Sequence, residues 1–289
     1  MSKRTILIQL DSDLHPSVFD RVVAVDAGAD EIFAYGNVSA DQVQGLVHGA
    51  IFTRGPADLC KTAIFIGGSD VGKGESLLTE VQKHMIPAFG LRVSVMLDAN
   101  GCNTTASAAV RSVEKHISGP GSRALVLGGT GPVGQRAALL LARGGFEVLL
   151  ASRSLERSET AAKAVQNLAL EGAKVRGVAP ANPQQLRDSL KGVGVVVAAG
   201  AAGVCLLPKS LWTSCPDLRV LVDLNAVPPL GIEGVEVMDK GNEREGKIVY
   251  GALGVGGQKM KLHRKAIQSL FESNKAVLDA VAIHGIELT

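Results

Sequence analysis

Short apolar runs alternate with helix-like stretches along most of this chain. In its first part, the strand-like runs TILIQL, EIFAYG, TAIFIGG and RVSVMLDA are separated by segments of helical periodicity such as SVFDRVVAVDAG and GESLLTEVQKHM. A strand followed by a helix, repeated, is the pattern of a parallel sheet covered by helices. The hydrophobic pattern therefore predicts an α/β fold.

A cluster of glycine and proline, SGPGSR at residues 118–123, precedes a second and more regular series. There the runs RALVLGG, EVLLAS, KVRGVA, VGVVVAAG, RVLVDLN and KIVYGAL alternate with helical patterns, which predicts a Rossmann-type, doubly wound parallel sheet. After Gly257 we expect a long helix and no strand. We therefore predict an N-terminal α/β domain, 1–119, completed by a C-terminal helix within 258–289, and a dinucleotide-binding domain, 120–257.

Composition and charge narrow the class of partner. With 289 residues, a hydrophobic fraction of 46% and a net charge of +2, the chain can fill the cores of two domains and has no long run of one charge. This favours a small molecule over nucleic acid or a membrane as the binding partner.

The apolar run that starts at Ile6 is stopped by Asp11, which predicts a first strand instead of a signal peptide. The four cysteines have no metal-binding spacing, so we expect free thiols, no metal and a cytoplasmic protein.

The segment GTGPVG lies directly after an apolar strand and directly before a predicted helix. Gly129 would make the tight turn, Gly131 would let the backbone approach a pyrophosphate at the helix N-terminus, and Gly134 would let helix and strand pack closely. The alternative is a plain connection whose glycines only turn the chain. Because a strand–helix–strand unit surrounds the motif, we favour a dinucleotide site. Its residues would be Gly129, Thr130, Gly131, Pro132, Val133 and Gly134.

The next strand, EVLLA, is followed by Ser152, Arg153 and Ser154 where an Asp or Glu is often found. An acidic residue there accepts hydrogen bonds from the ribose 2′-hydroxyl of NAD and would repel a 2′-phosphate. A guanidinium and two hydroxyls are instead donors for a phosphate, and each charge-assisted bond contributes about 1.5–3 kcal/mol. The loop therefore predicts NADP. Arg157, in the first turn of the next helix, either adds charge there or is an ordinary exposed helix residue.

Two common dehydrogenase mechanisms lack their residues in this chain. A short-chain reductase uses a Tyr-x-x-x-Lys pair, whereas Tyr35 and Tyr250 are followed four positions later by Ser39 and Gly254. A zinc-dependent alcohol dehydrogenase needs cysteine ligands at metal spacing. We therefore expect a dehydrogenase whose substrate itself donates the electron density that assists hydride loss, so that the enzyme needs no strong proton acceptor.

Five segments carry a family resemblance: HPSVFD (15–20), DANGCNTTAS (98–107), GGTGPVG, DLNAVPPLGI (223–232) and GALGVGGQKMKLHR (251–264). They resemble the NADP-dependent methylene-tetrahydromethanopterin dehydrogenases of methylotrophic bacteria over nearly the whole chain. The resemblance implies hydride transfer from methylene-tetrahydromethanopterin to NADP, and for some members also from methylene-tetrahydrofolate. It further implies a fold related to the methylene-tetrahydrofolate dehydrogenases, an active site in a crevice between two domains with a neighbouring subunit contributing, and a homotrimer.

By matching motifs, the resemblance places the pterin pocket at Phe19, Thr105, Lys259 and His263. From the residues alone, each has a second interpretation: Phe19 as core, Thr105 as a helix cap, and the last two as an exposed basic helix face. Lys259 and His263 share one helix face, and we expect Lys259 in the first turn after GVGG, where the helix N-terminus favours the neutral amine. We assign both to substrate orientation and charge tuning, because hydride loss from a carbon between two nitrogens depends chiefly on positioning.

Asn225 follows the strand RVLVDL, at the carboxyl end where ligands of open α/β sheets bind, so we expect its turn near the nicotinamide. Asp223 is expected only to hold this loop. Two other functions stay open. A methylene-tetrahydrofolate dehydrogenase, with or without cyclohydrolase activity, would prefer the folate carrier. A non-catalytic NADP-binding sensor would bind the cofactor and transfer no hydride.

Overall fold

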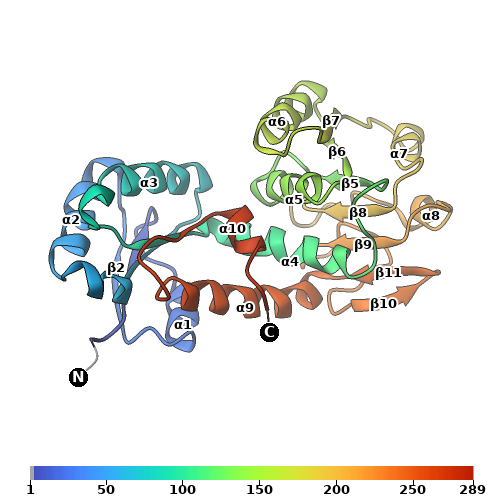
Figure 1. Ribbon diagram of the computed structural model, residues 1–289. Helices are drawn as coiled ribbons and strands as arrows, with labels where there is room; N and C mark the ends of the chain where they lie inside the picture. Colours follow the sequence, from blue (N-terminus) through green and yellow to red (C-terminus); the bar gives the residue numbers. More distant parts are fainter. Residues whose placement is uncertain (1–2, 289) are drawn as a thin grey trace. The chain divides into compact units, whose positions relative to one another are not determined.

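The chain forms two compact units in the computed structural model, which describes residues 3–288 (Figure 1). The first unit comprises Met1–Thr104 with Met260–Thr289, and the second comprises Thr105–Lys259. The predicted α/β class is confirmed in both units. The functions that the sequence assigns to the two parts of the chain stay predictions.

The first unit is a parallel sheet covered by helices. Its strands are β1 (Ile6–Asp11), β2 (Glu31–Tyr35), β3 (Thr62–Gly67), β4 (Ser94–Leu97) and β12 (Val277–Leu278), and its helices are α1 (Val18–Asp26), α2 (Val43–Phe52), α3 (Val71–Lys83) and α10 (Ala280–His284). Two further helices, α4 (Cys102–Glu114) and α9 (Ala252–Ser269), contain residues of both units. The strand order is β12-β4-β3-β1-β2, so the order reverses between β1 and β3.

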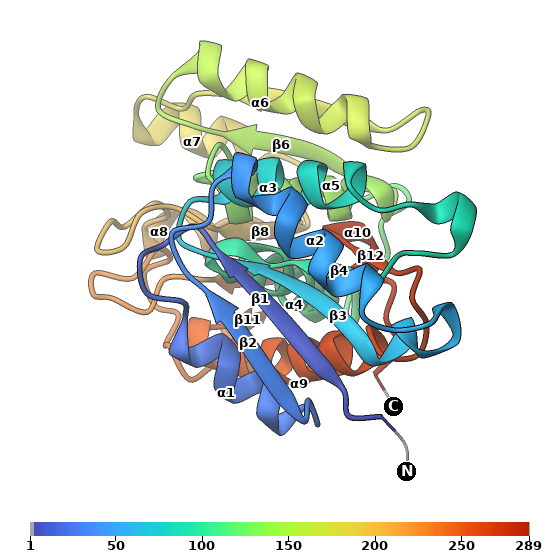
Figure 2. The same ribbon diagram turned by 90° about the vertical axis from the view of Figure 1, so that its left-hand side faces the viewer.

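Helices cover both faces of this first sheet. The chain's helix α1 and the end of α9 lie on one face, and α2 and α3 lie on the other (Figure 2). Phe65 of β3 packs there with Val23 of α1 and Leu262 of α9. Strand β3 is buried at every residue because it is an interior strand and helices cover both faces of the sheet, which explains its unbroken apolar run. Helix α1 begins where the Ser17 hydroxyl accepts a hydrogen bond from the Asp20 amide at 3.2 Å.

Strand β12 corrects the expectation that no strand follows Gly257. Its residues Val277 and Leu278 pair in parallel with β4 at the edge of the first sheet. Two residues are too few to show an alternating pattern, so the pairing depends on contacts made far away in sequence. The predicted return of the C-terminal helix to the N-terminal part is confirmed from Met260 onward.

The second unit is a doubly wound sheet. Its strands are β5 (Arg123–Leu127), β6 (Glu147–Ala151), β7 (Lys174–Val178), β8 (Val195–Ala198), β9 (Val220–Asp223), β10 (Lys240–Arg244) and β11 (Lys247–Tyr250), and its helices are α5 (Pro132–Arg143), α6 (Leu155–Leu168), α7 (Pro183–Ser189) and α8 (Lys209–Trp212). The order is β10-β11-β9-β8-β5-β6-β7, parallel except for β10. The order reverses between β5 and β8, which confirms the predicted Rossmann topology.

Apolar side chains of the second sheet pack under α7 and α8 in one continuous core around Trp212, which is fully buried. The indole of Trp212 donates a hydrogen bond to the carbonyl oxygen of Glu233 at 2.9 Å. Of the helices in the described part of the chain, none combines the length and the hydropathy that a bilayer crossing requires.

Candidate active site

The glycine turn connects β5 to α5 at the carboxyl edge of the second sheet, beside the point where the strand order reverses. Gly128 has a φ of +67°, and a Cβ there would lie 2.4 Å from the Cα of Gly200, which follows β8. Gly131 is the N-cap residue of α5, and no side chain among the described residues caps this end. A Cβ at Gly131 would lie 3.5 Å from the nearest atom. The turn therefore leaves room at a helix N-terminus, as an anion site requires.

The structure revises one glycine role and confirms another. The left-handed residue of the turn is Gly128, which the sequence did not single out; Gly129, to which the sequence assigned the tight turn, packs closely, because a Cβ there would lie 2.6 Å from the Cγ of Leu150. The close packing predicted for Gly134 is confirmed, because a Cβ there would lie 2.7 Å from the Cα of Gly129. Of the other residues in the turn, Thr130 is half-buried, Pro132 is exposed and begins α5, and Val133 is half-buried.

The loop after β6 lies at the same edge, because β6 pairs in parallel with β5. Ser154 is the N-cap residue of α6, and its Oγ accepts a hydrogen bond from the Arg157 amide at 3.3 Å. That hydroxyl keeps its hydrogen for donation to a ligand. Ser152 is half-buried, and Arg153 and Arg157 are exposed. Within residues 3–288 neither guanidinium forms an ion pair, so both charges are available at this edge.

The loop after β9 is held by Asp223, which is completely buried. Its carboxylate accepts hydrogen bonds from the amides of Asn225 at 3.0 Å and Ile232 at 2.8 Å. Burial raises the pKa of Asp223, although these amide bonds oppose the shift. The expectation that Asp223 holds the loop is confirmed. The Asn225 side chain bonds within the loop, to the Val227 amide at 3.0 Å and the Pro229 carbonyl at 3.2 Å, and its place near the nicotinamide stays a prediction.

The first unit has a polar edge of its own, where β1, β3 and β4 end. Asp11 is 1% exposed, and its carboxylate accepts a hydrogen bond from the Ser17 amide at 3.1 Å. Asp98 is equally buried and accepts from the amides of Asn103 at 2.9 Å and Thr104 at 3.0 Å. The two carboxylates fix the loops around the reversal point between β1 and β3. Neither carboxylate was predicted as a functional residue, although an Asp at the end of an apolar strand is the signal that could have identified them.

Two of the predicted pocket residues meet in the first unit. The His263 ring on α9 is completely buried and stacks on Phe65, with ring centroids 5.7 Å apart and an interplanar angle of 20°. Its centroid lies 6.3 Å from that of Phe19 on α1. Phe19 is 51% exposed, so its interpretation as a core residue is wrong. Burial of His263 likewise excludes an exposed basic face as its role.

The other two predicted pocket residues, Thr105 and Lys259, belong to the second unit. Thr105 lies inside the first turn of α4, so it is not the capping residue; the carboxylate of Asp98 accepts the bonds at that end. Lys259 is not in a first turn, because α9 already begins at Ala252. The helix-terminus effect fades within one turn, so it does not apply to Lys259. The glycines before it are helical: a Cβ at Gly254 would lie 1.8 Å from a backbone oxygen that precedes β10.

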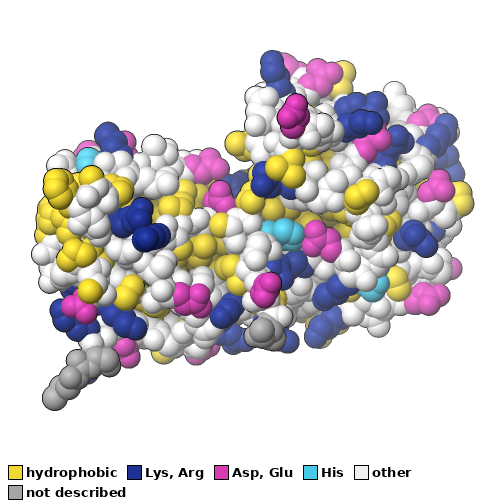
Figure 3. Space-filling model, viewed as in Figure 1, with side chains coloured by type: hydrophobic (Ala, Val, Ile, Leu, Met, Phe, Trp, Pro, Cys, Tyr) yellow, Lys and Arg dark blue, Asp and Glu magenta, His cyan; other side chains and the backbone are white. Residues whose placement is uncertain are grey.

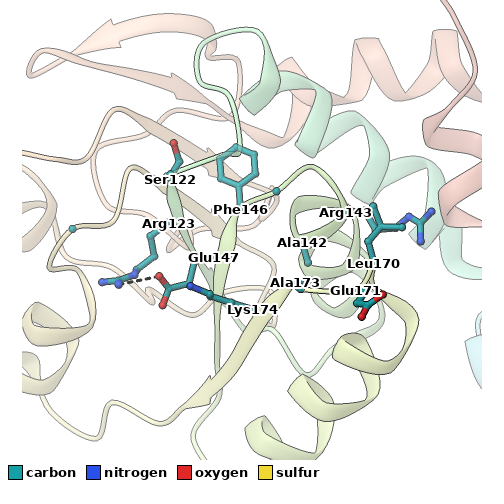
Figure 4. Close-up of a pocket in the computed structure, with 14 residues that line it drawn as sticks. Ser122, Arg123, Ala142, Arg143, Phe146, Glu147, Leu170, Glu171, Ala173 and Lys174 are labelled. Atoms are coloured by element: carbon teal, nitrogen blue, oxygen red, sulfur yellow. Dashed lines mark hydrogen bonds and ion pairs between the residues drawn. The ribbon is translucent and has the colours of Figure 1, made fainter.

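A cavity of about 460 Å³ lies at the opposite, amino-terminal edge of the second sheet (Figure 4). Glu147 in its wall accepts hydrogen bonds from Arg123 at 3.0 Å and from Arg176 at 2.7 Å. The Arg123 bond, supported by Arg176, holds the pKa of Glu147 below its usual value. Ligands of open α/β sheets bind at the carboxyl ends of strands, so this cavity is not the candidate active site. In the described part of the chain, no group of three or more His, Cys, Asp or Glu side chains is placed to hold a metal ion.

Two sheets, parallel except for β10, define a two-unit α/β protein with a Rossmann-type nucleotide-binding fold, because the second sheet is doubly wound and has a glycine turn at its reversal point. Residues 18–100 match the family model described as methylene-tetrahydromethanopterin dehydrogenase, N-terminal. The chain is 46% identical over 286 residues to the bifunctional protein MdtA of Methylorubrum extorquens, with 98% of each chain covered. It belongs to the methylene-tetrahydromethanopterin dehydrogenase family, which confirms the resemblance in its motifs.

A second relative in the same organism and a solved structure extend the comparison. The chain is 31% identical over 281 residues to the NAD(P)-dependent methylenetetrahydromethanopterin dehydrogenase of Methylorubrum extorquens, covering 94% of this chain and 93% of the relative. The shikimate 5-dehydrogenase of Listeria monocytogenes, solved with shikimate and NAD, superposes with a TM-score of 0.52 at 16% identity, covering 98% and 95%. This last similarity concerns the fold alone.

Proposed function

We propose that this protein is a dehydrogenase of one-carbon metabolism that transfers a hydride from methylene-tetrahydromethanopterin to NADP and leaves the methenyl form. The observation that carries the proposal is the similarity to MdtA over 98% of the chain, which includes both units. A dinucleotide-binding half alone would have been compatible with many substrates. The similar NAD(P)-dependent relative supports a nicotinamide cofactor.

The residues at the carboxyl edge of the second sheet fit NADP. NADP, when bound, supplies the hydride acceptor. The turn from Gly129 to Gly134 would hold the pyrophosphate, because α5 begins there without a side-chain cap and Gly131 leaves space. Ser152, Arg153 and Ser154 would donate to the 2′-phosphate, and Arg157 would add charge. The loop of Asn225 would lie beside the nicotinamide.

The proposed substrate residues are Phe19, Thr105, Lys259 and His263. The half-exposed ring of Phe19 offers an apolar surface for a flat pterin, and stacking on Phe65 fixes the His263 ring behind it. The product is a cation shared by two nitrogens whose lone pairs assist hydride loss. We therefore assign positioning to all four residues, and charge tuning to Lys259 and His263.

We further propose a cytoplasmic homotrimer that binds neither nucleic acid nor a membrane. The near-neutral charge of +2 supports the absence of a nucleic-acid or membrane partner, as does the interspersion of basic and acidic side chains over the face in Figure 3. A protein that binds nucleic acid through phosphate contacts would need a patch of one sign.

The test is NADP reduction, followed by near-ultraviolet absorbance, with methylene-tetrahydromethanopterin and methylene-tetrahydrofolate supplied in turn. We expect reduction with the first carrier. A strong preference for the second would make this a methylene-tetrahydrofolate dehydrogenase, and tight NADP binding without reduction by either would make it a sensor.

Cofactor preference is tested with Arg153→Asp. Loss of one charge-assisted contact of about 1.5–3 kcal/mol should weaken NADP binding roughly 10- to 150-fold and leave NAD nearly unchanged. Lys163→Asp is the matched control, because Lys163 is exposed on α6, away from its N-terminus, and the substitution changes the net charge equally. Equal loss of both cofactors in Arg153→Asp would contradict the assignment of the loop.

A further inference from the structure

Helix α1 has apolar side chains on two opposite faces. Val23 and Ala24 are buried in the core of the first unit. On the other face, Val18, Val22 and Val25 are 66%, 54% and 61% exposed. Their spacing of four and then three residues places them in one stripe along the helix. A stripe of three exposed valines on one short helix is the pattern of a helix that packs against another surface.

Opposite charges flank this stripe. Arg21 lies on one side of it and Asp26 on the other, and among residues 3–288 neither forms an ion pair. Arg21 Nη2 donates a hydrogen bond to the Pro16 carbonyl at 3.3 Å, whereas its buried Nε atom has no hydrogen-bond partner. The surface is hollowed here by about 420 Å³, and the hollow is lined by Val18, Arg21, Val22, Val25 and Asp26.

We infer that this stripe, Val18, Val22 and Val25 with Arg21 and Asp26, is where copies of this chain associate through parallel α1 helices around a symmetry axis. In heptad terms Val22 occupies an a position, Val18 and Val25 occupy d positions, and Arg21 and Asp26 occupy g and e. In a parallel arrangement a g residue faces the e residue five positions later on the neighbouring helix. Arg21 of each copy therefore meets Asp26 of the next.

The charges and the valines also select the geometry. An antiparallel pair would place like flanks together, Arg21 against Arg21 and Asp26 against Asp26, which is unfavourable. Branched side chains at both a and d positions favour three or four helices over two. The inference therefore deepens the trimeric part of the proposed function and rests on it. Nine residues are too few for an isolated coiled coil, so the contact requires the folded first unit to hold α1 in place.

The first experiment is sedimentation velocity on the full chain over a range of concentrations. The wild type is expected to associate, and Val22→Asp is expected to be monomeric. Leu168→Asp is the matched control, because Leu168 is 66% exposed on α6, and it should sediment like the wild type. A monomeric wild type, or association of Val22→Asp equal to that of the wild type, would overturn the inference.

A charge exchange tests the pairing itself. Arg21→Asp and Asp26→Arg are each expected to weaken association about 2- to 5-fold per pair, and the double variant should recover it. If the single variants weaken association and the double variant does not restore it, Arg21 and Asp26 do not pair across the contact and the inference fails.

Cysteine cross-linking tests the direction of the helices. In a Cys205→Ser background, which removes the exposed native thiol, Val18→Cys and Val25→Cys should each cross-link to its own copy under mild oxidation. Cross-links only in a mixture of the two variants would show antiparallel helices and refute the inference. NADP reduction is measured on the same wild-type samples. An associated but inactive protein would refute the proposed activity alone, and an active monomer would refute only the association.

Discussion

Gly134→Ala is the substitution whose effect on stability the structure predicts most directly. A Cβ at this position would lie 2.7 Å from the Cα and 3.0 Å from the carbonyl carbon of Gly129, and 2.8 Å from the carbonyl oxygen of Gly128. Ordinary carbon contacts begin near about 3.5 Å. All three atoms belong to the backbone of the glycine turn, so no side-chain rotation can relieve the overlap. Helix α5 and the turn would have to separate.

Two effects of opposite sign determine the magnitude. Overpacking a tight site costs about 1–3 kcal/mol, and contacts to backbone place Gly134 at the upper end. Alanine inside a helix is favoured over glycine by about 1 kcal/mol. We therefore expect Gly134→Ala to lower the free energy of unfolding by about 2 kcal/mol.

The assay is urea unfolding followed by the fluorescence of Trp212, the single tryptophan of the chain, which is buried in the second unit. Gly131→Ala is the matched control, because a Cβ at Gly131 would lie 3.5 Å from the nearest atom. It should lower the unfolding free energy by less than about 1 kcal/mol and weaken NADP binding, since its methyl group would project at the proposed pyrophosphate site. Wild-type stability in Gly134→Ala, or a larger loss in Gly131→Ala, would refute the reasoning.

Three further substitutions test other contacts. Ser154→Ala removes the N-cap of α6 and should lower the free energy of unfolding, measured in urea, by about 1 kcal/mol. The same variant should bind NADP more weakly in a titration. The Lys247 Nζ donates hydrogen bonds to the carbonyls of Cys215 at 2.7 Å and Leu218 at 2.9 Å. Lys247→Met removes this donor and should lower the free energy of unfolding by about 1–3 kcal/mol. Because burial raises the pKa of Asp223, its contribution to stability is fully present below the ordinary value of 3.8 and is lost as pH rises through the folded-state pKa. Asp223→Asn has no such loss, so the difference in unfolding free energy between the two proteins should shift against the wild type as pH rises above about 4, and a constant difference would contradict this.

Periodicity predicted most of the fold because each sheet is built from consecutive strand–helix units. It failed where a distant contact decided the structure. Strand β12 has two residues and forms only because β4 offers an edge. The start of α9 was placed too late because its glycines indicate a loop in sequence, whereas Gly251 and Gly254 let the helix approach the chain before β10. The sequence alone does not distinguish a glycine needed for close packing from a glycine needed for a turn.

The candidate site was predictable in residue types and less so in geometry. The glycine turn and the basic loop after β6 were identified because both lie within one strand–helix–strand unit. The left-handed position at Gly128 was missed because it depends on Gly200, which approaches from β8. Asp98 was missed for a related reason: its hydrogen bonds at the start of α4 become visible only when the loop after β4 is folded.

The sheets of this chain do not by themselves determine which substrate is bound. Its fold is shared with a shikimate dehydrogenase at 16% identity, so hydride chemistry on one scaffold serves unrelated substrates. Two of the proposed substrate residues lie outside the sheets, Phe19 on α1 and His263 on α9, and the His263 ring lies near Phe19 on one side and stacks on Phe65 of β3. The substrate preference should therefore follow Phe19 and His263, and the cofactor preference should follow Arg153, with each set changeable without the other.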